Sequence, residues 1–330
     1  MQTRTLGRTG RPVSIIGLGT WQLGSGWGDI HSPAADILDA SLRAGVTFFD
    51  TADGYGDGAS ERAIGAWRAG LSDEVRAGIT VATKMGRRAE QVPENYVLAN
   101  FRAWTDRSRE NLRMDTLDLV QLHCPPTSVY ADDAVFDSLD RLVAEGAIAA
   151  YGVSVETVEE ALTAIARPRV ASVQIILNAF RLKPLERVLP AALAAGVGII
   201  ARVPLASGLL SGRYDHDTTF AADDHRSFNR HGERFDRGET FSGVDYDEGV
   251  EAAREFSQLA ASAGLAPATA ALAWLIQQPG VTAAIPGARS VAQAEANAAA
   301  ASVPPLGAEF DAAVRDLYDR RIRAGVHASW

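Results

Sequence analysis

Residues 47–56 read TFFDTADGYG. The segment opens as a short run of apolar, β-branched and aromatic side chains, which is typical of a buried strand. Its second half is polar and contains two glycines, which favour a loop. Ser60 and Glu61 then begin a helix-like segment that runs to about residue 69. The stretch therefore predicts one strand–loop–helix unit that carries an aspartate and a tyrosine at the end of its strand.

The same unit recurs along the chain. Short apolar runs predict eight strands at residues 14–20, 47–52, 79–85, 117–123, 147–155, 172–178, 198–204 and 281–286. Helix-like segments lie between them at residues 33–44, 60–69, 96–113, 132–145, 157–166, 185–195 and 291–301. Strict alternation favours a parallel α/β sheet, and eight strands suit closure into a (β/α)8 TIM barrel.

The residues beyond these units have definite places. Gly7, Gly10 and Pro12 supply turn signals in residues 2–13, where we expect a small β-hairpin cap. A polar stretch at 212–245 and two helices, 246–263 and 267–278, separate the last two strands, and another helix is expected at 308–323. We expect residues 1–330 to form a single domain; a two-domain doubly wound protein is the alternative.

Composition excludes several classes of protein. A net charge of −9 provides no broad basic field, so we expect no nucleic-acid partner. Cys124 is the single cysteine, which excludes a disulfide framework, and no histidine or cysteine spacing indicates a metal site. No apolar run has the length of a membrane span and the N-terminus lacks a signal-peptide pattern, so we expect a cytoplasmic protein without a membrane partner.

Four residues at strand ends could carry chemistry. Asp50 and Tyr55 follow the second strand, Lys84 ends the third, and His123 ends the fourth. A lysine on an apolar strand requires a buried carboxylate, for which Asp50 is the natural partner. A lysine beside a phenol also lowers the pKa of the phenol, which makes Tyr55 a usable proton donor. A structural ion pair beside an unrelated tyrosine is the alternative.

These residues, in this order, resemble the catalytic tetrad of the aldo-keto reductase family. The resemblance extends over nearly the whole chain through segments 17–21, 50–56, 122–123, 152–154, 174–178 and 204–212. It implies direct hydride transfer from NADPH to an aldehyde or ketone, sugar-derived carbonyls included, without a metal. Tyr55 would donate the proton, Lys84 and Asp50 would tune it, and His123 would orient the substrate.

The resemblance also implies where NADPH binds. Gly17-x-Gly19 is not a dinucleotide fingerprint, because Gln22 occupies the third glycine position. Arg289 and Ser290, at the start of a helix, would hold the 2′-phosphate, while Ser154 and Gln174 would hold the nicotinamide amide. The full set of implied cofactor-binding residues is Thr20, Trp21, Asp50, Ser154, Gln174, Arg202, Pro204, Leu205, Ser207, Gly208, Leu209, Ser211, Gly212, Arg213, Ile285, Gly287, Arg289, Ser290, Gln293 and Asn297.

Three positions depart from the family's common pattern. Val155 replaces an asparagine, Ala296 replaces an acidic residue, and Arg202 stands where many members stack an aromatic ring on the nicotinamide. A guanidinium can also stack on a ring, so we expect Arg202 to substitute for the aromatic side chain. The expected substrate-binding residues are Trp21, Trp27, Tyr55 and His123.

Two other functions are compatible with a barrel of this kind. One is an NADPH-binding sensor or partner subunit with little turnover, which the intact tetrad disfavours. The other is a barrel isomerase or hydrolase that uses no nicotinamide. The pattern does not predict the physiological substrate or the oligomeric state, because loops build the substrate pocket independently of the fold.

Overall fold

The computed structural model of the chain describes residues 1–24 and 31–330. Within these residues, eight parallel strands form one curled sheet in the order β10-β9-β8-β7-β6-β5-β4-β3. Their bounds are Leu18–Gly19 (β3), Phe48–Asp50 (β4), Thr80–Met85 (β5), Leu119–His123 (β6), Tyr151–Ser154 (β7), Val170–Ile176 (β8), Gly198–Arg202 (β9) and Val281–Ala284 (β10). The edges meet through parallel bridges that pair Ile16 with Ala284 and Gly19 with Gly287. The predicted (β/α)8 fold is confirmed.

Several strands are shorter than the sequence predicts. The first predicted strand, 14–20, is divided, because Ser14 belongs to an N-terminal hairpin and only Leu18–Gly19 pairs with β4. The fifth predicted strand, 147–155, extends only over Tyr151–Ser154 in the structure. Apolar runs therefore identify each strand and its order correctly, while hydrogen bonding to the neighbouring strands sets its ends.

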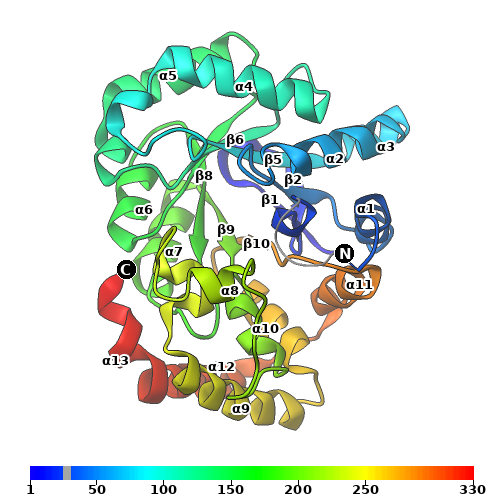
Figure 1. The fold of residues 1–330 in the computed structure, drawn as a ribbon, viewed down its shortest axis with the longest axis vertical. Helices are drawn as coiled ribbons and strands as arrows, with labels where there is room; N and C mark the ends of the chain where they lie inside the picture. Colours follow the sequence, from blue (N-terminus) through cyan, green and yellow to red (C-terminus); the bar gives the residue numbers. More distant parts are fainter. Residues whose placement is uncertain (25–30) are drawn as a thin grey trace.

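Helices surround the strands (Figure 1). Their bounds are Ala34–Arg43 (α1), Ala59–Ala69 (α2), Asp73–Ala77 (α3), Leu98–Leu112 (α4), Asp133–Ala144 (α5), Val158–Ile165 (α6), Pro184–Ala195 (α7), His225–Phe228 (α8), Tyr246–Ser262 (α9), Pro267–Ile276 (α10), Val291–Ala299 (α11), Gly307–Leu317 (α12) and Arg323–Val326 (α13). The short helix α3 is not predicted from the sequence. In Figure 1, α9, α12 and α13 gather at one side of the molecule.

The N-terminal hairpin closes one end of the barrel interior. Its strands β1 (Thr3–Thr5) and β2 (Pro12–Ser14) pair antiparallel, as predicted. Leu6, in the turn between them, is fully buried in a cluster with side chains from five strands of the barrel. A Cβ atom at Gly7 would lie 2.0 Å from the Ala171 carbonyl oxygen, so only glycine allows the turn to approach the sheet this closely. The hairpin therefore covers the amino ends of the strands and leaves the carboxyl ends for function.

The polar stretch between β9 and α9 folds onto the carboxyl end of the barrel. We call residues 213–245 the covering segment. Phe220 and Phe241 anchor it, with ring centroids 5.8 Å apart, and Phe220 also meets Tyr214 at 5.2 Å. These aromatic side chains thus pack the segment against the hydrophobic core. In the part of the chain that the structure describes, no single helix is long and apolar enough to span a membrane, although α9 and α10, bent by 82°, meet that criterion as a pair.

Candidate active site

The four predicted catalytic residues come together at the carboxyl end of the barrel. Asp50 is the last residue of β4, Lys84 lies near the end of β5, and His123 is the last residue of β6. Tyr55 lies in the loop between β4 and α2, where its amide donates to the Ala52 carbonyl at 3.1 Å. Parallel pairing brings these strand ends to one edge, which is where barrels carry their functional residues.

Lys84 links the carboxylate to the phenol. Its Nζ atom lies 2.5 Å from Asp50 Oδ1, 2.8 Å from the Thr51 carbonyl oxygen and 3.3 Å from the Tyr55 hydroxyl. Lys84 is 1% exposed and Asp50 2% exposed. Two opposite charges are thus buried together, which is the condition under which a protein tolerates either of them. The predicted buried pair is present, and its lysine also contacts the predicted tyrosine.

Two glutamines hold the second oxygen of the carboxylate. Gln174 Nε2 donates to Asp50 Oδ2 at 2.8 Å, and Gln121 Nε2 donates to it at 3.2 Å. Gln121 was not among the predicted site residues. Its only signal in the sequence is a polar side chain two residues before His123 on an otherwise apolar strand. Both amides orient Asp50, so its other oxygen faces Lys84.

The pKa of Tyr55 differs in direction from the sequence-based expectation. Burial raises the pKa of the phenol above its ordinary value, and Asp50 and Glu239 add to this, while Lys84 lowers it. The lysine acts in the predicted direction, but burial is larger. For Lys84 itself, burial lowers the pKa, but the Asp50 carboxylate and Tyr55 outweigh it, so the net pKa is raised. Tyr55 is therefore protonated and Lys84 charged at neutral pH.

His123 is held as a neutral imidazole. Burial lowers its pKa well below the ordinary value, and the positive charges of Arg87, Lys84 and Arg202 lower it further. Its ring lies edge-on to that of Tyr55, with centroids 5.9 Å apart. A neutral imidazole can donate one hydrogen bond without repelling Lys84. Burial and the three neighbouring cations therefore favour the neutral ring.

A cavity of about 460 Å³ opens beside these groups. The predicted residues that line it are Thr20, Trp21, Asp50, Tyr55, His123, Gln174, Arg202, Pro204, Leu205, Ser207, Gly208, Ile285, Gly287, Arg289 and Gln293. Other predicted residues lie outside its lining, namely Lys84, Ser154, Leu209, Ser211, Gly212, Arg213, Ser290 and Asn297. Trp27 lies outside the described residues. The cleft thus runs from the tetrad to the start of α11.

Some of these outlying residues have structural contacts instead. Ser154 is buried, and its Oγ accepts from Cys124 Sγ at 3.4 Å. Leu209 is fully buried in the hydrophobic core. Ser290 caps α11 by accepting from the Gln293 amide, and Asn297 donates to the Gly287 carbonyl at 3.1 Å. These residues shape the walls of the cleft from behind.

Arg202 lies on the floor of the cleft within a charge pair. Its Nη2 atom donates to the Val155 carbonyl at 2.9 Å, and its Nη1 atom forms an ion pair with Glu239. Burial raises the pKa of Glu239, but Arg202 and Arg87 outweigh it, so the net pKa is lowered and the carboxylate is charged. Sequence reasoning missed Glu239, because it belongs to the covering segment, where no periodicity relates it to β9.

The covering segment also reaches the predicted substrate residue Trp21. The His225 ring lies 4.7 Å from the Trp21 ring and the Phe235 ring 6.2 Å from it, measured between centroids. Burial lowers the pKa of His225 to about 4, so it is a neutral ring at physiological pH. His225 thus lines the cleft from the covering segment, and Phe235 contacts Trp21 from the same segment.

The far end of the cleft is basic. Arg289 and Arg226 both line it, and Asp224 lies between them, with Oδ2 3.5 Å from Arg289 Nη2. The Arg289 amide donates to Gln293 Oε1 at 2.7 Å. An anion that enters here would meet two guanidinium groups at the start of a helix, a favourable place for a phosphate.

Comparison with known proteins agrees with this geometry. The model of the aldo/keto reductase family matches residues 15–319. An oxidoreductase of Mycobacterium tuberculosis, described as uncharacterized, is 35% identical over 94% of this chain and 90% of its own length. Among solved structures, the glycerol dehydrogenase of Gluconobacter oxydans superposes with a TM-score of 0.76 at 29% identity, covering 94% of this chain and 93% of that one.

A structure from Klebsiella pneumoniae adds a cofactor-bound relative. It is an aldo-keto reductase in complex with NADPH, and it matches 96% of each chain with a TM-score of 0.69 at 25% identity. The family match extends over the strands, the four converging side chains and the cleft beside them. This chain belongs to the aldo/keto reductase family.

Proposed function

We propose that this protein reduces an aldehyde or ketone to an alcohol with NADPH, and that Tyr55 donates the proton. The observation that carries the proposal is the Lys84 ammonium, which contacts both Asp50 and the Tyr55 hydroxyl at the edge of the cleft. A buried ammonium ion stabilises the phenolate that remains after proton transfer. The same ammonium ion is held in place by a carboxylate that two glutamines orient.

The residues of the cleft fit the cofactor. Arg289 and Arg226 supply positive charge at one end, and the tetrad lies at the other. NADPH, when bound, would supply a hydride to the carbonyl carbon. Tyr55 would donate the proton to the carbonyl oxygen. A Cβ atom at Gly287, on the wall between the two ends, would lie 2.3 Å from Gln22 Oε1, so a larger residue there would displace the Gln22 side chain.

His123 and Tyr55 would act on the same oxygen atom of the substrate. A neutral His123 donates a hydrogen bond that orients the carbonyl, and Tyr55 transfers its proton as the alkoxide forms. Arg202, held by Glu239 and the Val155 carbonyl, would lie against the nicotinamide ring as the expected aromatic residue would. Trp21 and His225 would close the cleft over the substrate.

The experiment is a screen of carbonyls and alcohols that follows nicotinamide absorbance with NADPH and with NADH. Glyceraldehyde and dihydroxyacetone come first, because a structural relative is a glycerol dehydrogenase. The proposal predicts turnover with at least one carbonyl. Tight NADPH binding without turnover would instead indicate a sensor, and failure to bind either cofactor would indicate a nicotinamide-independent barrel enzyme.

The 2′-phosphate role of Arg289 has its own test. Replacing Arg289 with alanine removes a charge-assisted hydrogen bond, so we expect NADPH affinity to fall about tenfold, with NADH affinity nearly unchanged. Fluorescence titration measures both. Arg43→Ala, an exposed arginine on α1, is the matched control. An equal loss for both cofactors would remove Arg289 from the phosphate site.

A further inference from the structure

A second cavity lies at the opposite end of the barrel, and its lining is rich in arginine. It has a volume of about 400 Å³. Arg11, Arg68, Arg76 and Arg113 line it together with Asp115 and Asp118. These residues come from the N-terminal hairpin, from α2, and from the segments that precede β5 and β6. The cavity is thus remote from the tetrad, which lies where β4, β5 and β6 end.

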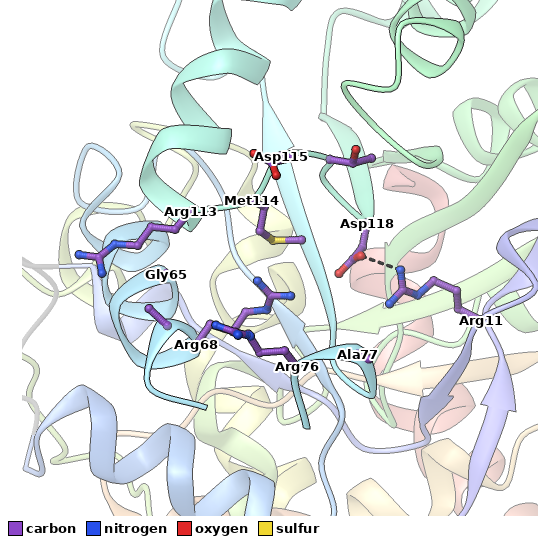
Figure 2. Close-up of a pocket in the computed structure, with 11 residues that line it drawn as sticks. Arg11, Gly65, Arg68, Arg76, Ala77, Arg113, Met114, Asp115 and Asp118 are labelled. Atoms are coloured by element: carbon purple, nitrogen blue, oxygen red, sulfur yellow. Dashed lines mark hydrogen bonds and ion pairs between the residues drawn. The ribbon is translucent and has the colours of Figure 1, made fainter. Parts of the chain in front are cut away.

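We call this cavity the arginine pocket. An ion pair between Arg11 and Asp118 forms one side of it. Arg11 Nη1 lies 2.6 Å from Asp118 Oδ1 (Figure 2), and Asp118 Oδ2 accepts from the Val81 amide at 2.9 Å. Arg11 also donates to the Ile79 carbonyl at 3.3 Å. Both oxygens of Asp118 are therefore occupied within the protein.

The other side of the pocket holds a cation that lacks such a partner. Figure 2 shows Arg68 and Arg76 together across from the Arg11–Asp118 pair. Arg76 forms an ion pair with the exposed Asp73. The Nε atom of Arg68 is buried and has no hydrogen-bond partner among the described residues. Burial lowers the pKa of Arg68, Asp118 raises it, and Arg76 and Arg11 lower it further.

Helix packing holds Arg68 in this position. A Cβ atom at Gly65 would lie 2.2 Å from the Asn111 carbonyl oxygen, so α2 packs directly on the end of α4. Arg68 follows Gly65 by three residues and lies on the same face of α2, which directs it toward the pocket. The position is set by the fold, and it leaves the buried Nε donor without a hydrogen-bond partner among the described residues.

We propose that the arginine pocket binds a phosphate group, either inorganic phosphate or the phosphate of a small metabolite. Four arginines face two aspartates in this cavity, although the whole chain carries a net charge of −9. Guanidinium groups match phosphate oxygens through paired hydrogen bonds, and an entering phosphate would satisfy the buried donor of Arg68. The cavity has the size of ordinary small-molecule sites.

Calorimetric titration of inorganic phosphate into the NADPH-saturated protein tests the proposal, because NADPH then occupies the end of the cleft near Arg289. One phosphate should bind per chain, and Arg68→Met should weaken it by about tenfold or more. Arg68→Lys keeps the charge without the planar group, so its affinity for phosphate should lie between those of the wild type and of Arg68→Met. Arg43→Met is the control, and it should bind phosphate as the wild type does.

The source of the phosphate is distinguished by a second arm with glycerol 3-phosphate and with glycerol. Tighter binding of the ester than of inorganic phosphate supports a metabolite, equal binding supports the free ion, and glycerol should not bind. Equal affinity in the wild type and in Arg68→Met, or a loss that follows Arg289→Ala instead, would overturn the proposal. In that case Arg68 contributes only packing at the wall of the pocket.

Discussion

The two ends of the barrel treat buried charge differently. At the carboxyl end, Lys84 and Asp50 neutralise each other. Asp53, nearby, has both carboxyl oxygens buried without a hydrogen-bond partner among the described residues, and burial, with Glu61 adding to it, raises its pKa to about 7. An acid in this position can lose its charge by binding a proton. Arg68, at the amino end, has no such route, because a guanidinium group stays protonated. The buried Nε donor of Arg68 therefore fits an external anion, whereas the buried carboxyl group of Asp53 needs none.

The largest expected effect comes from removing the cation of the carboxyl end. Lys84→Met leaves Asp50 buried without its counter-charge, so we expect a loss of about 3–5 kcal/mol of stability together with loss of reduction. Urea unfolding and steady-state kinetics measure these. Arg43→Met controls for loss of a positive charge as such. A variant as stable as the wild type would show that the pair is not what keeps Asp50 buried and charged.

Asp53 gives the next effect, and it depends on pH. Its folded pKa of about 7 lies above an ordinary aspartate value near 3.9, so the folded state holds a proton that the unfolded state releases in between. The contribution of Asp53 to the free energy of unfolding is fully present below pH 4 and is lost as the pH rises toward 7. Asp53→Asn should therefore gain stability over the wild type, by roughly 2–4 kcal/mol at pH 8 and much less at pH 5.

Unfolding of the wild type and of Asp53→Asn at pH 5 and at pH 8 measures this difference in stability. If Asp53→Asn gains the same stability at pH 5 and pH 8, Asp53 does not titrate in this range. Its carboxyl group would then carry a charge that the surrounding residues already compensate.

The smallest expected effect concerns the amino end. In phosphate-free buffer, Arg68→Met should be more stable than the wild type by about 1 kcal/mol, because it removes a partly buried guanidinium group whose Nε has no hydrogen-bond partner in the described part of the chain. Saturating phosphate should reverse the order. Thermal unfolding in chloride and in phosphate at equal ionic strength measures both. A destabilised variant in both buffers would show that Arg68 contributes packing alone.

The sequence predicts the two ends unequally for a physical reason. Asp50, Tyr55, Lys84 and His123 each follow or end an apolar strand, so local pattern alone places them at one edge. Glu239 and His225 reach the cleft from the covering segment, whose position depends on Phe220 and Phe241 packing far along the chain. Arg68 gives no local signal either, because an arginine on an amphipathic helix usually faces solvent. The burial of its Nε atom depends on tertiary packing of α2 against α4, which Gly65 permits.

Removal of the Tyr55 hydroxyl oxygen tests the proposed proton donor most directly. Tyr55→Phe removes the hydroxyl that Lys84 contacts and leaves the ring beside Trp21 and His123. For a carbonyl that the wild type reduces, we expect kcat/KM to fall by about a hundredfold or more, while the Kd for NADPH stays within about twofold. Reduction at the wild-type rate by a variant that binds NADPH normally would contradict the assignment of Tyr55 as the proton donor.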